Sequence, residues 1–330
     1  MWLLSLLAVL SHADAAGFEI KTMRAPLSAV EVERPLVIGK GWLEASLGYD
    51  QKMADGAWSS TGEATQWKSA QWLYTTERLG IRYGISRSGE FYWDIPFHYV
   101  RLRNDALGTD TEGFGIGEPV FGWKWELFNR TIPTSSVALD LRYKMPTGQE
   151  TAGTYIGGPN TVSTFPMSTG QADISAFIRG KQQFGPFAVE GAIGYIDRLS
   201  GVSQFVVEVD QYQFSGRFKP GSEVRAELSP MLQLGPVAIH GDAVYRRWFE
   251  GAVGTTAGGA FWDENLDPIA GSDGWSLDAG GGVVVNASRG VDVLASASVP
   301  IRGEDLTFFP LESISPTRGI TLSTSVELRY

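Results

Sequence analysis

The sequence of 330 residues predicts an all-β fold, an antiparallel transmembrane β-barrel in the outer membrane of a Gram-negative cell. Three observations support this prediction. Apolar and polar residues alternate with a period of two in many segments, short connections alternate with long ones, and an export signal precedes the first segment. Counting the segments gives about twelve strands.

Residues 1–16 have the features of a signal peptide. An apolar run extends from Trp2 to Leu10, and Ala13-Asp14-Ala15 after it fits the small-x-small rule for cleavage. We therefore expect the mature chain to start near Ala16. No Lys or Arg precedes the apolar run. This departs from the usual signal and leaves a buried N-terminal strand or helix as the alternative.

The alternation is clearest in the last eleven residues of the sequence. One face carries Ile320, Leu322, Thr324, Val326, Leu328 and Tyr330, and the other carries Thr321, Ser323, Ser325, Glu327 and Arg329. A charged face cannot be a protein core, so the apolar face is the one expected to be covered, in this case by lipid. The aromatic end resembles the C-terminal signal of outer-membrane barrels, and we expect the barrel-assembly machinery to recognise the strand ending at Tyr330.

The predicted strands are long enough to cross a membrane, because about ten to thirteen tilted residues span a hydrocarbon layer about 25 Å tall. Alternation weakens at residues 72–77, which indicates a bulge in the second strand. The strands are placed at residues 40–50, 69–85, 89–103, 115–128, 135–145, 170–183, 187–198, 222–234, 237–248, 275–287, 291–301 and 318–330.

The connections between these strands alternate in length. Short ones are expected at 86–88, 184–186, 235–236 and 288–290, with a modest one at 129–134, and long ones lie between them. Short periplasmic turns and long extracellular loops are typical of outer-membrane barrels, whereas a soluble β-sandwich has mixed lengths at both ends. We therefore assign residues 40–330 to the barrel. Residues 17–39 are assigned to a periplasmic N-terminal segment, which could instead fold inward as a plug.

Composition limits the partners. After residue 16 no stretch has the ~18 consecutive apolar residues of a membrane-spanning helix. The net charge of −10 argues against nucleic acid as a partner, and the absence of Cys is compatible with a barrel closed by its own hydrogen bonds. The expected partners are outer-membrane lipid and small organic solutes, with the chain as a monomer.

Enzyme chemistry is not expected. Only His98 and His240 follow the signal, and neither has the nucleophilic Ser close after it that outer-membrane phospholipase A requires. Residues 263–267 begin like a calcium loop, but Pro268 and Gly274 stand where the turn Gly and the bidentate Glu should be. We expect no catalytic residue, no cofactor and no metal, and interpret 263–267 as part of an acidic outer loop.

The polar faces of the strands predict a lumen lined by charges of both signs, which favours neither an anion nor a cation ring. These charges could pair into ladders that close the barrel or leave a thin polar path. Assigned to the lumen are Arg78, Arg82, Asp94, His98, Lys124, Glu126, Asp140, Arg142, Glu190, Arg225, His240, Asp242, Glu327 and Arg329, and also Lys144, Asp173, Arg179, Lys181, Glu223, Glu227 and Arg246.

The aromatic residues indicate which face of the strands contacts lipid. They are expected to form a girdle at the membrane interface, or in part the wall of a lateral exit for apolar compounds. The residues of this stripe are Phe91, Trp93, Ile95, Phe97, Tyr99, Phe121, Trp123 and Trp125.

Several short segments, spread over most of the mature chain, resemble the outer-membrane transporter family named for the MetA pathway of phenol degradation. They are 36–44 (LVIGKGWLE), 79–86 (LGIRYGIS), 91–101 with Ile95-Pro96-Phe97, 115–119 (GIGEP), 143–148 (YKMPTG), 168–173 (STGQAD) and Gly194-Tyr195. The resemblance implies a membrane channel with a role in the uptake of small organic compounds, and it supplies no catalytic residues.

The sequence therefore leads to two main hypotheses for function, and a barrel enzyme acting on lipids is a third, more distant one. The first is an outer-membrane channel for the passive passage of small compounds, hydrophobic or aromatic ones among them. The second is an outer-membrane structural or adhesion barrel whose lumen is closed by salt bridges.

Overall fold

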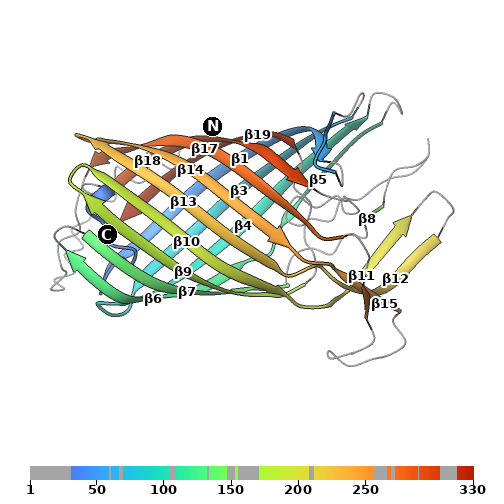
Figure 1. Cartoon of the computed structure of the whole chain (residues 1–330), viewed down its shortest axis with the longest axis horizontal. Coiled ribbons are helices and arrows are strands. Elements are labelled where there is room, and N and C mark those ends of the chain that lie inside the picture. Colours follow the sequence, from blue (N-terminus) through green and yellow to red (C-terminus); the bar gives the residue numbers. More distant parts are fainter. Residues whose placement is uncertain are drawn as a thin grey trace.

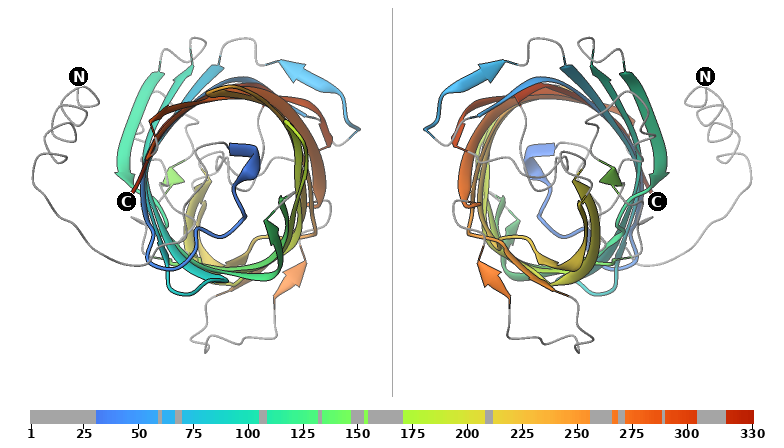
Figure 2. Two further views of the ribbon diagram at one scale, coloured as in Figure 1. Left: turned by 90° about the vertical axis from the view of Figure 1, so that its left-hand side faces the viewer. Right: turned by 90° about the vertical axis from the view of Figure 1, so that its right-hand side faces the viewer.

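Twelve strands of the computed structural model close into one antiparallel barrel (Figure 1). Each barrel strand pairs with the next one along the chain, and the last pairs with the first to complete the ring. Figure 2 looks along the barrel from its two ends. The structure describes residues 31–58, 61–66, 70–104, 109–131, 134–146, 153–154, 171–207, 212–255, 266–268, 272–288, 290–304 and 318–330.

The barrel strands match the number and order predicted from the alternation. They are β1 (Leu43–Trp58), β3 (Ala70–Gly84), β4 (Gly89–Asn104), β6 (Val120–Thr131), β7 (Thr134–Lys144), β9 (Asp173–Phe184), β10 (Phe187–Arg198), β13 (Glu223–Leu234), β14 (Val237–Trp248), β17 (Gly274–Ser288), β18 (Val291–Glu304) and β19 (Arg318–Arg329).

Further strands lie in regions that were expected to be loops. β2 (Ala64–Gln66) pairs with β1, and β5 (Thr109–Ile116) pairs with β4. These hairpins continue past the barrel because their backbones still find partners there. A separate small sheet contains β8 (Gly153–Thr154), β11 (Gly201–Val207), β12 (Tyr212–Lys219), β15 (Ala252–Thr255) and β16 (Asp267–Pro268).

Two details of the predicted strands are wrong. β3 pairs with both neighbours without a register shift, so the bulge expected at 72–77 is absent. The alternation is obscured there because Trp72 and Tyr74 share the interior face with Arg78. The predicted strand at 115–128 is instead interrupted, since β4 pairs with β6 only up to Val120 and with β5 from Ile116. Pro119 lies in the gap and has no N–H to donate.

Short turns join the strands at one end of the barrel, as predicted. β9 and β10, and likewise β13 and β14, are connected by two residues each. Gly185 and Gly235 stand first in these turns, with φ of 61° and 64°. Glycine adopts this left-handed conformation without steric cost, so the chain can reverse within two residues.

The outward face of the barrel is apolar. Trp93, Phe121, Trp123 and Trp125 of the predicted aromatic stripe are exposed large side chains, together with aliphatic residues on the other strands. The rings of Phe91, Trp123 and Trp125 contact one another in sequence across β4 and β6. None of the helices among the described residues is long and apolar enough to cross a membrane.

Candidate functional site in the barrel interior

The N-terminal segment occupies the end of the barrel that carries the short turns. Its described part is residues 31–39, which include the 3-10 helix η1 (Glu31–Glu33). Figure 2 shows η1 inside the ring of strands. For residues 17–39 the sequence was compatible with either an external tail or an inward plug. In the structure residues 31–39 lie inside the barrel.

Apolar contacts hold this plug against the barrel wall. Val32 is 1% exposed and packs with Ala188 of β10 and Met231 of β13. Leu36 and Val37 pack with Ala138 of β7 in the same way. Each of these wall residues takes an interior position where most neighbours are polar, so the interior surface is shaped to receive the plug.

Hydrogen bonds to the plug backbone add to these contacts. Lys181 Nζ donates to the carbonyl of Glu31 at 2.9 Å, and Lys124 Nζ donates to the carbonyl of Leu36 at 3.1 Å. In the other direction, the backbone N–H of Ile38 donates to Glu90 at 2.7 Å. The plug is therefore anchored through polar groups that do not depend on its own side chains.

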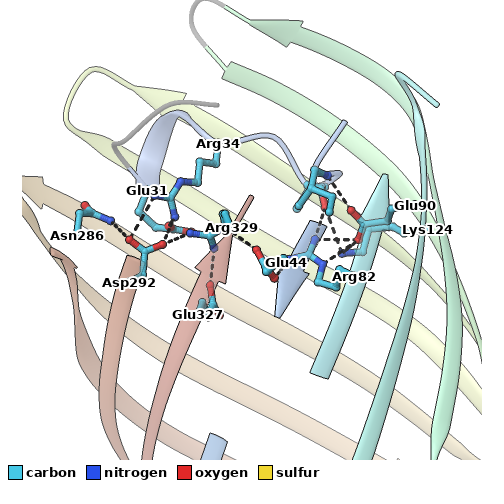
Figure 3. Close-up of polar contacts among 12 residues, drawn as sticks. Glu31, Arg34, Glu44, Arg82, Glu90, Lys124, Asn286, Asp292, Glu327 and Arg329 are labelled. Carbon is cyan, nitrogen blue, oxygen red and sulfur yellow. Dashed lines mark hydrogen bonds and ion pairs between the residues drawn. The ribbon is translucent and has the colours of Figure 1, made fainter. Parts of the chain in front are cut away.

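A connected set of ion pairs, the closure cluster, crosses the junction where β19 meets β1 (Figure 3). Arg34 of the plug lies 2.6 Å from Asp292, which also pairs with Arg329. Arg329 lies 2.5 Å from Glu44 of β1. The set continues through Arg82 and ends at Glu90 and Lys124.

Three carboxylates, Glu44, Glu90 and Asp292, are the most deeply buried members of this cluster. Arg82 lies 2.8 Å from Glu44 and 2.8 Å from Glu90, and Lys124 lies 3.1 Å from Glu90. Glu90 and Asp292 are 0% exposed. Removing one cation would leave a buried carboxylate with fewer partners, which is costly in a medium of low polarity. The predicted residues Arg82, Lys124, Glu327 and Arg329 belong to this cluster.

A second group, the central cluster, lies between β4 and β13. Asp140 accepts hydrogen bonds from Tyr92 at 2.6 Å, from Arg142 at 2.6 Å and from Arg179 at 2.9 Å. Arg179 also lies 3.3 Å from Glu227 and 3.7 Å from Glu190. Predicted residues from four strands thus join in one network.

Phe177 is an interior residue that the charge pattern did not reveal. It is 1% exposed, and the guanidinium of Arg142 lies 4.5 Å from its ring centre. Its ring lies against Gly194, where any side chain would collide with it. The signal available in the sequence is its position on β9, halfway between Ser175 and Arg179 on the polar face.

Other predicted interior residues lie outside these two clusters. Arg78 pairs with Asp50 at 2.6 Å, and Arg225 pairs with Glu223 at 2.8 Å. Asp94 lies opposite Gly80 in the register of β3 and β4.

Glu126 accepts a hydrogen bond from Ser136 at 2.5 Å.

Sequence reasoning missed several charged residues that form ion pairs in the interior, namely Arg34, Glu44, Glu90, Arg198 and Asp292. The parity of their strands gives the same interior face for Glu44, Glu90, Arg198 and Asp292, whereas Arg34 precedes the first strand.

The two histidines have different surroundings. Nδ1 of His98 lies 3.0 Å from both Tyr74 Oη and Thr76 Oγ1. Nδ1 of His240 lies 2.7 Å from Asp242, and Ser229 donates to the other oxygen of Asp242 at 2.7 Å. Because this serine binds the aspartate and not the imidazole, the group lacks the nucleophile-to-base contact of a catalytic triad.

The opposite side of the interior is built differently. On β17, β18, β19 and β1, beyond the residues of the closure cluster, many interior positions carry glycine or a small hydroxyl residue that is partly exposed. We call this surface the small-residue wall. It consists of Ser46, Gly48, Gly280, Gly282, Ser296, Ser298, Thr321, Ser323 and Ser325.

The comparisons with known proteins establish the fold. No protein-family description matches the chain, and no curated protein matches its sequence. An outer membrane channel from Pseudomonas putida F1 has 11% sequence identity and a TM-score of 0.66, over 88% of this chain and 96% of that one. At this identity the likeness is one of fold.

Two further solved barrels have lower scores. The translocator domain of autotransporter NalP from Neisseria meningitidis has 14% identity and a TM-score of 0.47, over 98% of both chains. The Pseudomonas putida toluene transporter TodX has 9% identity and a TM-score of 0.41, over 87% of this chain and 89% of that one. These two scores carry no weight for this chain.

The closed barrel and its apolar outward face identify the chain as an outer-membrane protein. Its short turns then face the periplasm and its long connections face the outside of the cell. The plug and the closure cluster accordingly lie at the periplasmic end, and the small sheet formed by β8, β11, β12, β15 and β16 lies at the extracellular end.

Proposed function

We propose that the chain is a passive outer-membrane channel for small organic compounds, hydrophobic or aromatic ones among them. It would act as a monomer, without catalysis and without a cofactor. The observation that carries this proposal is the small-residue wall. Its Gly, Ser and Thr residues are partly exposed, whereas Glu90, Asp140 and Phe177 across the barrel are buried by their neighbours.

The path we propose follows this wall from the extracellular end down to the plug. Small side chains leave more room in front of a strand than arginine or aromatic ones do. At the periplasmic end residues 31–38 occupy the interior. Passage through the lumen therefore requires the plug to move, and the turn at Gly39 and Gly41, where φ is 69° and 80°, is the place for it to pivot.

The class of solute rests on the resemblance to the transporter family of phenol degradation. The wall itself supports small molecules with some polarity, because serine and threonine hydroxyls can bind them. The fold shared with a Pseudomonas outer membrane channel agrees with a channel function. The residues assigned to the lumen remain part of this proposal.

The second candidate is a structural or adhesion barrel with a closed lumen. The specific observation in its favour is the plug together with the closure cluster, which links β18, β19, β1, β3, β4 and β6. If the plug never leaves, the interior has no continuous path and the ion pairs serve only stability.

Solute flux into liposomes distinguishes the two candidates. The native chain is compared with the double variant Val32→Ser and Arg34→Gln, which removes an apolar contact and an ion pair of the plug. Glu33→Gln is the matched control, because Glu33 is the exposed residue of the same helix. Slower migration after boiling on a denaturing gel verifies that each barrel is folded.

Under the channel proposal, phenol enters faster than in empty liposomes, and the double variant increases the rate over that of the native chain and of Glu33→Gln. Background flux for the native chain and for the folded double variant would reject the channel and favour the closed barrel. Release of fatty acid from phospholipid by the purified chain would reject the proposal that it has no enzymatic activity.

A further inference from the structure

A patch of aromatic and basic residues lies on the outward face of the barrel at its extracellular end. It consists of Tyr245 and Arg247 on β14, Trp275 on β17 and Arg302 on β18. The register places Arg247 on one side of Trp275 and Glu304 on the other, and Arg302 opposite Leu277, so one carboxylate borders the patch. The four side chains therefore belong to one continuous surface of three neighbouring strands.

Contacts within the patch orient its members. The ring centres of Tyr245 and Trp275 are 6.2 Å apart, and the guanidinium of Arg302 lies 5.9 Å from the Trp275 ring centre. Arg247 lies 2.8 Å from Asp273, and the two side chains are 40% and 38% exposed. A pair this exposed is worth little, so Arg247 can exchange its partner at small cost.

The surface below the patch is lipid-facing. Between the patch and the periplasmic end the same three strands expose Ile239, Val283 and Val299 on the outward face. The aliphatic residues thus lie on the membrane side of the patch, and within the patch the basic residues lie beside the aromatic ones. Aromatic side chains favour the level of lipid headgroups, and basic ones favour the anionic groups just above it.

A shallow cleft lies next to the patch on the extracellular side. It has a volume of about 470 Å³ and is lined by Phe249, Glu250, Pro268 and Asp273. Asp273 is the residue that pairs with Arg247, so the cleft begins where the patch ends. Its two acidic residues would repel an anion inside the cleft. An anionic group would therefore bind next to Arg247 and Arg302, outside the cleft.

We propose that this patch binds the phosphorylated headgroup of a lipid in the outer leaflet. The phosphate would receive hydrogen bonds from Arg247 and Arg302, whose planar guanidinium groups suit phosphate oxygens. The acyl chains would lie along the aliphatic residues of β17 and β18. This site is on the outside of the barrel and does not depend on the channel function proposed above.

The test uses bisphosphorylated lipid A and the refolded full chain in detergent, with retained lipid counted by native mass spectrometry. The variant is R247Q together with R302Q. R101Q together with R103Q is the matched control, because these arginines are exposed on β4 and make the same change of charge. Migration before and after boiling verifies that every barrel is folded.

We expect the R247Q and R302Q variant to bind lipid A about tenfold more weakly, as loss of a charged hydrogen bond implies. The control should bind like the native chain. Equal binding by the native chain and the variant, or equal losses in the variant and the control, would overturn the proposal. Displacement of lipid A by excess inorganic phosphate would assign the site to a free anion and would also overturn it.

Discussion

The two sides of the barrel interior differ in how their side chains fill space. On β4, β6, β7, β9 and β10 the interior face is packed, and we call it the packed wall. Glu90, Asp140, Phe177 and Ala188 on it are each at most 1% exposed. The small-residue wall of β17, β18, β19 and β1 carries glycine and hydroxyl residues that stay partly exposed.

This difference separates two roles that a charged interior could have. The charged side chains of the packed wall form ion pairs and hydrogen bonds with one another. These interactions stabilise the barrel and the plug. The path that we propose for a solute follows the small-residue wall, whose nine residues carry no charge. The charged residues assigned to the lumen therefore stabilise the proposed channel and line little of its path.

The largest effect on stability is expected for Asp140→Ala in the packed wall. This variant leaves Arg142 and Arg179 without the carboxylate that both contact, and loss of one member of a buried ion pair costs about 3 to 5 kcal/mol. Unfolding by urea in lipid vesicles, followed by tryptophan fluorescence, measures it. Asp278→Ala is the control, because Asp278 lies 3.5 Å from Arg246 and should cost less. Equal losses would contradict the distinction between the walls.

Val32→Ala should have the next largest effect. Val32 packs against Ala188 and Met231. Shortening this side chain should lower the free energy of unfolding by about 2 kcal/mol. Because the plug is held in part by this contact, the same variant should raise solute flux. A destabilised barrel with unchanged flux would mean that the plug does not limit passage.

The same substitution on both walls gives a smaller, direct test. Ser136→Ala removes a hydroxyl that donates to Glu126 at 2.5 Å on the packed wall, and about 1 to 2 kcal/mol of unfolding free energy should be lost. Ser323→Ala on the small-residue wall should change it by less than about 0.5 kcal/mol. Urea unfolding of the two variants side by side measures the difference, and a reversed order would refute the assignment of the walls.

Ser323→Trp should change stability by less than about 1 kcal/mol, yet reduce flux to background. Under the channel proposal, the added indole would lie in the path of the solute. Thr324→Trp is the control, because residue 324 is exposed on the opposite, outward face of the same strand. Flux of both variants is compared in liposomes, and equal flux would place the path elsewhere.

The sequence predicted the barrel well because its alternation is a direct consequence of lipid on one side and polar residues on the other. The same parity is the basis for assigning Arg82, Asp140 and Arg329 to the interior face. Twelve strands follow from counting segments of this kind, without knowledge of any contact between them.

The plug could not be predicted in the same way. Residues 31–38 have no strand period, and their position depends on contacts with strands far along the chain. A signal is nevertheless present in Ala138 and Ala188, which interrupt the polar interior faces of their strands with small apolar side chains. Such positions indicate an apolar cover from inside the barrel, although they do not say which segment supplies it.

The ion pair between Glu44 and Arg329 has a consequence for the order of folding. The two residues are separated by 285 positions, whereas every other pairing in the ring joins a barrel strand to the next one along the chain. Folding thus consists of local hairpin steps and one long-range step. Loop closure over that length costs about 5 kcal/mol of entropy in an unstructured chain, so pairing of β1 with β19 is the least local step, and we expect it to limit the rate of folding. The rate of refolding should therefore depend on Glu44 and Arg329 far more than on ion pairs within neighbouring hairpins.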